Sequence, residues 1–173
     1  MKPLSSTPSS AFSPPVNTAP RATASQPPMV AWLGYGGLIP FVCLPAAALA
    51  GGDVGAFCSR ALLAYGAVIL CFVGALHWGF AMALPAIGRR RRNQMWSWSV
   101  VPALLAWVAL LLAPAAGGVL MVAGFLVQYR QDRRLVRKVS LPPWYLALRL
   151  RLTLVACACL LEGVVASFRP AVQ

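Results

Sequence analysis

Few side chains in this sequence could do chemistry. The 173 residues include one histidine, three acidic residues and five cysteines. His77 and Glu162 both fall inside long apolar stretches, where an ionisable side chain is costly and a functional role is the default hypothesis. His77 is 12 residues from Arg89, and Glu162 is 11 residues from Arg151. Because both depths come to about 16–18 Å at helical rise, we expect His77 and Glu162 to pair or to share a polar pocket.

The predicted pair of His77 and Glu162 allows two interpretations. It could be a structural hydrogen bond between two helices, worth about 1 kcal/mol. It could instead be a proton relay or a ligand site, since histidine changes its charge near neutral pH. We favour the structural interpretation, because one histidine and one acid make a short relay.

A second polar pair lies beside a basic segment, residues 130–138. Gln128 and Asp132 are four residues apart, so one helical face can present both. Asp132 stands among five basic residues, which we expect it to neutralise. The alternative is that Asp132 orients Arg149 or Arg151. The candidate functional polar residues are therefore His77, Glu162, Gln128, Asp132 and Arg149.

Catalytic, cofactor and metal sites are not indicated. The cysteines form no CxxC motif, and we interpret them as small apolar packing residues. One histidine excludes a multi-histidine metal centre within one chain. The sequence also has no glycine-rich phosphate loop and no paired carboxylates for acid–base chemistry. We expect a non-enzymatic protein that needs no cofactor.

Composition places these residues in a membrane protein. The chain is 60% hydrophobic and 10% charged, yet its formal net charge is +12. A soluble domain carries about 25% charged residues. Residues 1–28, rich in proline and serine, predict a flexible tail, and residues 29–169 predict a multi-span transmembrane domain. The expected fold class is all-α, an integral membrane helical bundle.

Five transmembrane spans are predicted from the uncharged stretches and their breaks. They cover roughly 30–50, 60–84, 96–113, 116–130 and 147–168. The third and fourth come from one apolar stretch, which we divide because Pro114, Gly117 and Gly118 signal a turn.

The basic residues support this division and orient the chain. A hairpin puts the arginine-rich residues 89–92 and the segment 130–138 on the same side, as the positive-inside rule favours. All of the 15 basic residues except Arg60 and Arg169 then lie on the inner side. The N-terminus is predicted inside and the C-terminus outside.

Partners follow from the same pattern. Small residues recur every four positions in the second span and predict a close helix contact: Ala67, Cys71, Ala75, Gly79 and Ala83. The arginine-rich segments directly flank predicted spans, so we expect them to meet the bilayer and its anionic headgroups and not nucleic acid. A membrane-protein partner is also compatible with the sequence.

Four segments carry a family resemblance. LGYGGLIPF at 33–41, YGAVILCFVGALHWG at 65–79, SVVPALLAW at 99–107 and LPPWYLALR at 141–149 are similar to motifs of the domain-of-unknown-function 3429 family, the transmembrane protein 69-like proteins. The resemblance covers about residues 31–166. It implies a small multi-span helical protein of bacterial inner membranes or of mitochondria, with no established activity, substrate or cofactor. It also marks His77, Trp78, Trp144 and Arg149 as motif positions.

Two functions are compatible with these features. The first is a structural or assembly module of larger membrane complexes, and the second is a small proton-linked carrier that uses His77 and Glu162. Residues 1–28 lack the arginine-rich amphipathic character of a mitochondrial transit peptide. We therefore expect a bacterial inner (plasma) membrane, with the mitochondrial inner membrane as the alternative.

Overall fold

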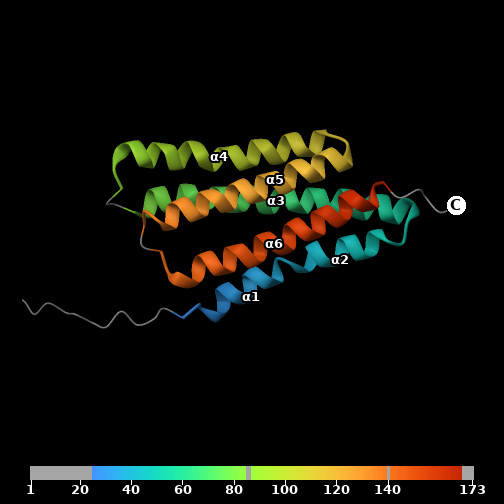
Figure 1. Cartoon of the computed structure of the whole chain (residues 1–173), viewed down its shortest axis with the longest axis horizontal. Helices are drawn as coiled ribbons and strands as arrows, with labels where there is room; N and C mark the ends of the chain where they lie inside the picture. The colour runs from blue at the N-terminus through green and yellow to red at the C-terminus, as the bar shows by residue number, and fades with distance from the viewer. Residues whose placement is uncertain (1–24, 85–86, 140, 169–173) are drawn as a thin grey trace, which may run out of the picture.

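The computed structural model describes residues 25–84, 87–139 and 141–168, and in these residues all regular structure is α-helical. The helices are α1 (Pro28–Gly36), α2 (Ile39–Ala48), α3 (Gly52–Ala83), α4 (Arg89–Leu111), α5 (Pro114–Val136) and α6 (Pro143–Ala166). The four long helices, α3 to α6, lie side by side along one long axis, and α1 and α2 follow one another beside α6 (Figure 1). The predicted all-α fold class is therefore confirmed. Part of the predicted tail, residues 1–24, lies outside the described residues.

The first predicted span is two short helices in series. Gly36 ends α1, and Pro40 lies in the first turn of α2. The backbone carbonyl of Gly37, between them, accepts a hydrogen bond of 2.8 Å from the Tyr65 hydroxyl on α3. A backbone group freed at a helix break needs such a partner when no water can reach it. Phe41 then packs edge-on against Tyr65, in the core of the bundle.

The long apolar stretch after α3 is divided, as predicted, but its turn comes earlier. α4 ends at Leu111 and α5 begins at Pro114, a position where the missing N–H of proline costs nothing. Gly117 and Gly118 are not the turn; they are buried in α5. A Cβ on Gly118 would run into the Val164 side chain, so this glycine lets α5 and α6 approach closely.

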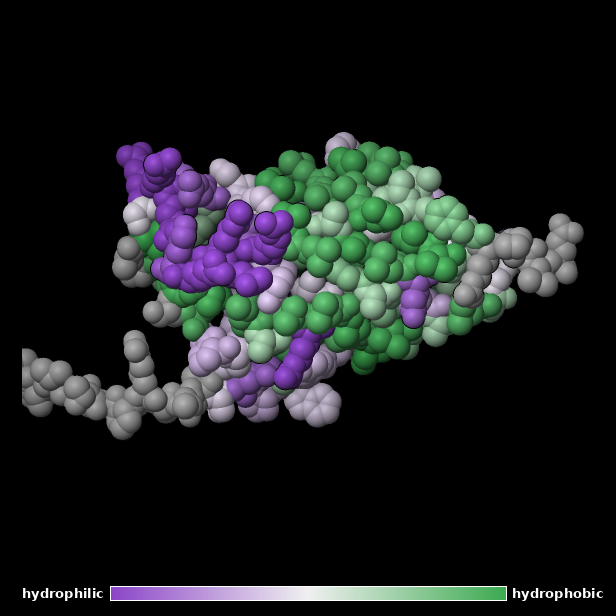
Figure 2. Space-filling model, viewed as in Figure 1, coloured by the Kyte–Doolittle hydropathy of each residue, from purple (hydrophilic) through white to green (hydrophobic). Residues whose placement is uncertain are grey.

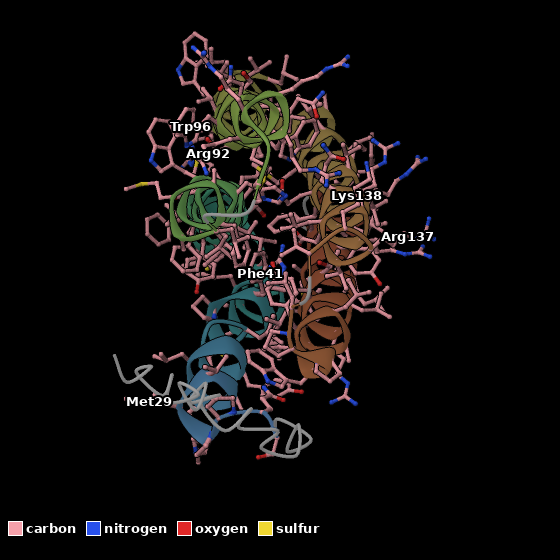
Figure 3. All side chains as sticks on the ribbon, turned by 90° about the vertical axis from the view of Figure 1, so that its left-hand side faces the viewer. Met29, Phe41, Arg92, Trp96, Arg137 and Lys138 are labelled. Atoms are coloured by element: carbon pink, nitrogen blue, oxygen red, sulfur yellow. The ribbon has the colours of Figure 1, made fainter. Side chains whose placement is uncertain are left out.

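Helices at the basic end extend further than the predicted spans. Residues 89–92, expected in a loop, form the first turn of α4, and α5 continues to Val136. Arginine is a good helix former, so a charge that ends an apolar span does not end the helix. The bundle thus has one strongly hydrophilic end, seen in Figure 2, and most of that face beyond it is apolar, apart from smaller hydrophilic patches. Seen from this end, Arg137 and Lys138 lie across the bundle from Arg92 (Figure 3).

The surface and the helix lengths are those of a membrane protein. Three stretches are long and apolar enough to cross a bilayer: Pro28–Ala48, which joins α1 and α2, then Gly52–Ala83 and Arg89–Leu111. Large apolar side chains such as Phe72, Trp107 and Leu111 are exposed on the outside of the bundle. A soluble monomer rarely exposes so much contiguous apolar surface.

The predicted small-residue stripe on α3 is right only at its start. Ala67 is buried and Cys71 half-buried, whereas Ala75, Gly79 and Ala83 are exposed. A four-residue repeat drifts about 40° around the helix at every step, because an α-helix has 3.6 residues per turn. The positions of α3 that stay buried follow the shorter period: Leu62, Gly66, Leu70, Val73, His77 and Ala81.

α3 and α4 approach each other closely at Gly74. A methyl group on Gly74 would lie 2.8 Å from Pro102 Cγ and 3.2 Å from the Ser99 carbonyl oxygen. One atom belongs to a proline ring and the other to the backbone of α4, so neither is the end of a flexible side chain that could move away.

Gly74→Ala should therefore destabilise the protein although alanine is the better helix former. We expect a loss of about 1–3 kcal/mol from overpacking, measured by unfolding the purified protein in detergent. Gly79→Ala is the matched control on the same helix, since nothing lies within 4 Å of the added methyl group. Equal stability of the two variants would contradict the packing described for Gly74.

Candidate functional site

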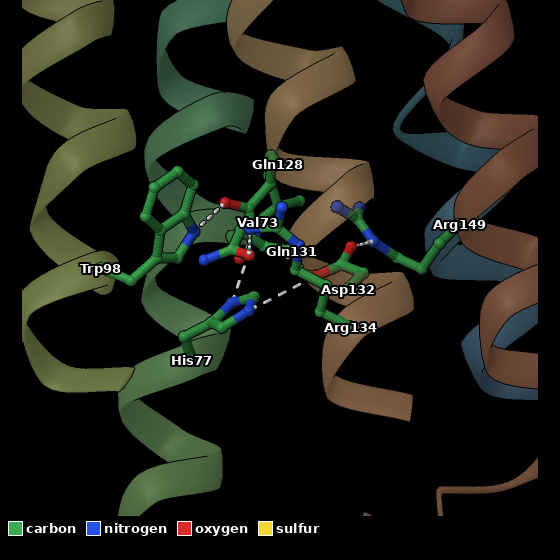
Figure 4. Close-up of polar contacts among 8 residues, drawn as sticks. All are labelled: Val73, His77, Trp98, Gln128, Gln131, Asp132, Arg134 and Arg149. Atoms are coloured by element: carbon green, nitrogen blue, oxygen red, sulfur yellow. Dashed lines mark hydrogen bonds and ion pairs between the residues drawn. The ribbon is translucent and has the colours of Figure 1, made fainter. Parts of the chain in front are cut away.

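A buried polar cluster joins the four long helices near the basic end of the bundle. His77 comes from α3, Trp98 from α4, Gln128 and Asp132 from α5, and Arg149 from α6 (Figure 4). Four of the five are buried, and Trp98 is half-buried. The structure thus brings together four of the five polar residues that the sequence singles out.

The ion pair of Asp132 and Arg149 is the strongest contact of the cluster. Arg149 Nε donates to Asp132 Oδ2 at 2.7 Å. Asp132 is fully buried, and Arg149 is 7% exposed. A charge-assisted hydrogen bond of this length is about twice as strong as a neutral one. Of the two predicted roles for Asp132, contact with Arg149 is the one observed; Arg151 donates instead to the Tyr35 hydroxyl at 3.2 Å.

Gln128 is at the centre of the cluster. Trp98 Nε1, which can only donate, lies 2.9 Å from Gln128 Oε1 and so fixes the orientation of the amide. Gln128 Nε2 therefore faces three acceptors: the Val73 carbonyl oxygen at 3.3 Å, Asp132 Oδ1 at 3.3 Å and His77 Nδ1 at 3.2 Å. One amide thus connects α3, α4 and α5.

This network also assigns the tautomer of His77. Because Gln128 Nε2 is a donor, His77 Nδ1 is the acceptor, and a neutral ring then has its proton on Nε2. His77 Nε2 lies 3.8 Å from Asp132 Oδ1, too far for a hydrogen bond, and has no hydrogen-bond partner among the described residues. His77 thus presents a buried donor that the cluster itself leaves unused.

Glu162 does not meet His77, so the predicted pairing is wrong. Gly163, the next residue, packs against Leu62 of α3. His77 is 15 residues further along α3, about 22 Å away at helical rise. Glu162 itself is exposed. The predicted depth of Glu162 takes Arg151 as the edge of the membrane. Arg149 and Arg151 in fact lie well inside α6, near the level of His77, so Glu162 lies much further along the bundle than predicted.

Sequence reasoning missed the partners of His77 and the part played by Trp98. The signal was the distance of each residue from its helix end: His77 is six residues before the end of α3, Asp132 four before the end of α5, and Arg149 six after the start of α6. These residues are therefore level in the bundle. For Trp98, no pattern in the sequence marks its indole as a donor to Gln128.

The chemistry available to the cluster is limited. His77 Nε2 is 3.8 Å from Asp132 Oδ1, beyond the reach of a direct proton transfer, and Arg149 holds the Asp132 charge in place. Beyond the cluster, the buried core among the described residues is mostly apolar, with Leu70, Met121 and Leu160 in it. The other buried polar side chains that the structure describes are Ser99 and Thr153. No group of three or more histidine, cysteine or acidic side chains gathers as metal ligands would in this part of the chain.

Fold and cluster together define a helical membrane protein. The chain belongs to the family described as "Protein of unknown function (DUF3429)", which its residues 26–165 match. Transmembrane protein 69 from Xenopus tropicalis is 36% identical over 149 residues, which cover 85% of this chain and 58% of the relative. The chain thus spans somewhat over half the length of that relative. No solved structure matches. The resemblance found in the sequence is confirmed.

Asp132→Asn tests the ion pair. The substitution keeps the shape of the side chain but leaves the Arg149 guanidinium buried without a counter-charge, so we expect a loss of about 3–5 kcal/mol in detergent unfolding. The double variant Asp132→Asn/Arg149→Met should recover part of this loss, because it removes both charges. Glu162→Gln is the control at an exposed acid and should leave stability unchanged. An Asp132→Asn protein as stable as Glu162→Gln would disprove the buried pair.

Proposed function

We propose that the chain crosses the bacterial inner membrane five times, with its N-terminus inside and its C-terminus outside. The α1–α2 pair, α3 and α4 are long and apolar enough to cross. α5 and α6 are 23 and 24 residues long, which at about 1.5 Å per residue exceeds a hydrocarbon core of about 30 Å. Each of the two helices contains charged residues, which lower its mean hydropathy. Five crossings also gather the arginine-rich helix ends on one side, which agrees with the positive-inside rule.

We further propose that the protein is a non-enzymatic structural or assembly module of membrane complexes. The observation that carries this is how the polar cluster is used. Gln128, Asp132 and Trp98 are bonded to one another or to neighbouring helices, so they fix the bundle and leave little to act on a substrate. What the protein offers to others is its exposed apolar helix surface.

The carrier hypothesis is less well supported. It depends on His77 and Glu162 sharing a pocket, and these residues lie about 22 Å apart along the bundle. A carrier also needs several polar positions near the middle of the membrane, and beyond the cluster the buried polar side chains of the described residues are Ser99 and Thr153 alone.

Thiol labelling distinguishes five crossings from three. In a cysteine-free background, Pro142→Cys between α5 and α6 should be labelled by an impermeant reagent only after the cells are opened. If α5 and α6 did not cross, this position would be outside and labelled on intact cells. Leu112→Cys, between α4 and α5, is the matched control, since both models place it outside.

The assembly role predicts a partner. Purified in mild detergent, the chain should bring down a second membrane protein in fixed stoichiometry, measured by native mass spectrometry. Cells lacking the chain should hold less of the assembled complex. A monomer whose flux in liposomes is abolished by Glu162→Gln would contradict this proposal and favour the carrier.

A further inference from the structure

A basic pocket opens at the inner end of the bundle. It has a volume of about 750 Å³ and lies among α3, α4 and α5. Arg90 and Arg91 of α4, Arg134 of α5 and Lys138 just after α5 line it, and His77 of α3 lies on its wall. The same hydrophilic end is the one seen in Figure 2.

The charges of this pocket are not balanced by the protein. No acidic residue lines it, and the whole sequence has three. Of these, Asp132 is held by Arg149, while Asp53 and Glu162 lie toward the other end of the bundle, beside the start of α3 and the end of α6. Arg134 does have a partner, Gln131 Oε1 at 3.1 Å, but that partner is neutral.

The start of α4 adds to this positive potential. The N-terminus of a helix has a partial positive charge and favours anions. Here the first turn contains no acidic residue and holds four arginines instead. Such a turn is unfavourable by itself, and a bound anion would relieve the repulsion.

His77 supplies a second, independent indication of a ligand. The residue is 3% exposed, lines the pocket, and has an Nε2 atom with no hydrogen-bond partner among the described residues. A buried polar atom without a partner is costly unless something else provides one. Since Gln128 leaves the proton on Nε2, this atom is a donor without an acceptor in hydrogen-bond reach, the Asp132 Oδ1 atom being 3.8 Å away.

The deeper wall of the pocket is apolar. Trp98 and Val101 line it, and Val101, 40% exposed, is 11 residues after Arg90, about 16 Å further along α4. In the five-crossing topology this depth lies within the hydrocarbon. Cationic groups at the surface with an apolar wall beneath them match an amphiphile and not a small soluble anion.

We propose that this pocket binds the phosphate headgroup of an anionic membrane lipid, with its acyl chains along Trp98 and Val101. The proposal deepens the proposed function and rests on the crossings of α4 and α5, since these put the pocket at the bilayer surface. The bound lipid then forms part of the module, held between the cationic ends of two helices.

A pair of charge-matched variants tests the site. Arg90→Gln/Arg134→Gln removes two lining cations, and Arg89→Gln/Arg133→Gln removes two cations one position earlier on the same helices that do not line this pocket. Each is reconstituted in nanodiscs of phosphatidylcholine with phosphatidic acid, phosphatidylglycerol or cardiolipin. Retained lipid is measured by native mass spectrometry, and detergent unfolding checks that both variants are folded.

The expected result is selective loss. The lining variant should bind the anionic phospholipids at least about tenfold more weakly, whereas the control should stay near the unchanged protein. Equal losses of lipid binding in both variants would mean that general surface charge, and not this pocket, retains the lipid, and would overturn the proposal. Displacement of the lipid by inorganic phosphate or glycerol phosphate at comparable concentration would also overturn it, in favour of a soluble ligand. Labelling of Pro142→Cys tests the topology separately, so the two failures are distinguishable.

Discussion

The fold depends on one charge, the carboxylate of Asp132. It is fully buried among four helices, in a chain with only three acids. Removing such a charge from water costs several kcal/mol, and only close partners offset that cost. Arg149 supplies the counter-charge and Gln128 a hydrogen bond. Each of these partners then needs its own neighbours, so burying one carboxylate fixes the relative positions of α3, α4, α5 and α6.

This constraint divides the bundle into two parts. Near the basic end the helices are held by directional polar contacts, which specify the register of one helix against another. Toward the other end the helices are held together by close packing. Glycines such as Gly117 and Gly118 lie where two helices approach closely, and apolar side chains fill the core. Lipid provides no hydrophobic drive between helices, so packing and hydrogen bonds must supply the association. The basic side chains at the polar end that take no part in the cluster, such as Arg90 and Arg134, are the ones available to a ligand.

Much of the architecture could be predicted from the sequence. Uncharged stretches indicate where the helices lie. The distribution of basic residues correctly predicts that the long apolar stretch is two helices, and the second of them begins at Pro114. The four-residue spacing of Gln128 and Asp132 placed both on one face of α5. All of these are local properties of the chain, and each depends on a period or a composition that tertiary packing does not change.

What the sequence could not supply was register between helices. The pairing of His77 with Glu162 was wrong because depth was counted from charges, and Arg149 belongs inside the bundle with Asp132 and not at its edge. The small residues from Ala67 to Ala83 do not form one contact face beyond Cys71, because positions four residues apart rotate progressively around a helix of 3.6 residues per turn. Trp98 was beyond reach, since its indole donor matters only through the side chain it faces.

The break between α1 and α2 links this stretch of the chain to its neighbour. The two helices have 9 and 10 residues, about 14 and 15 Å, so neither alone is as long as a hydrocarbon core of about 30 Å. The Gly37 carbonyl at their junction accepts its hydrogen bond from the Tyr65 hydroxyl of α3. The α1–α2 pair therefore satisfies this carbonyl only with α3 beside it, which couples the order of the junction to the packing of α3.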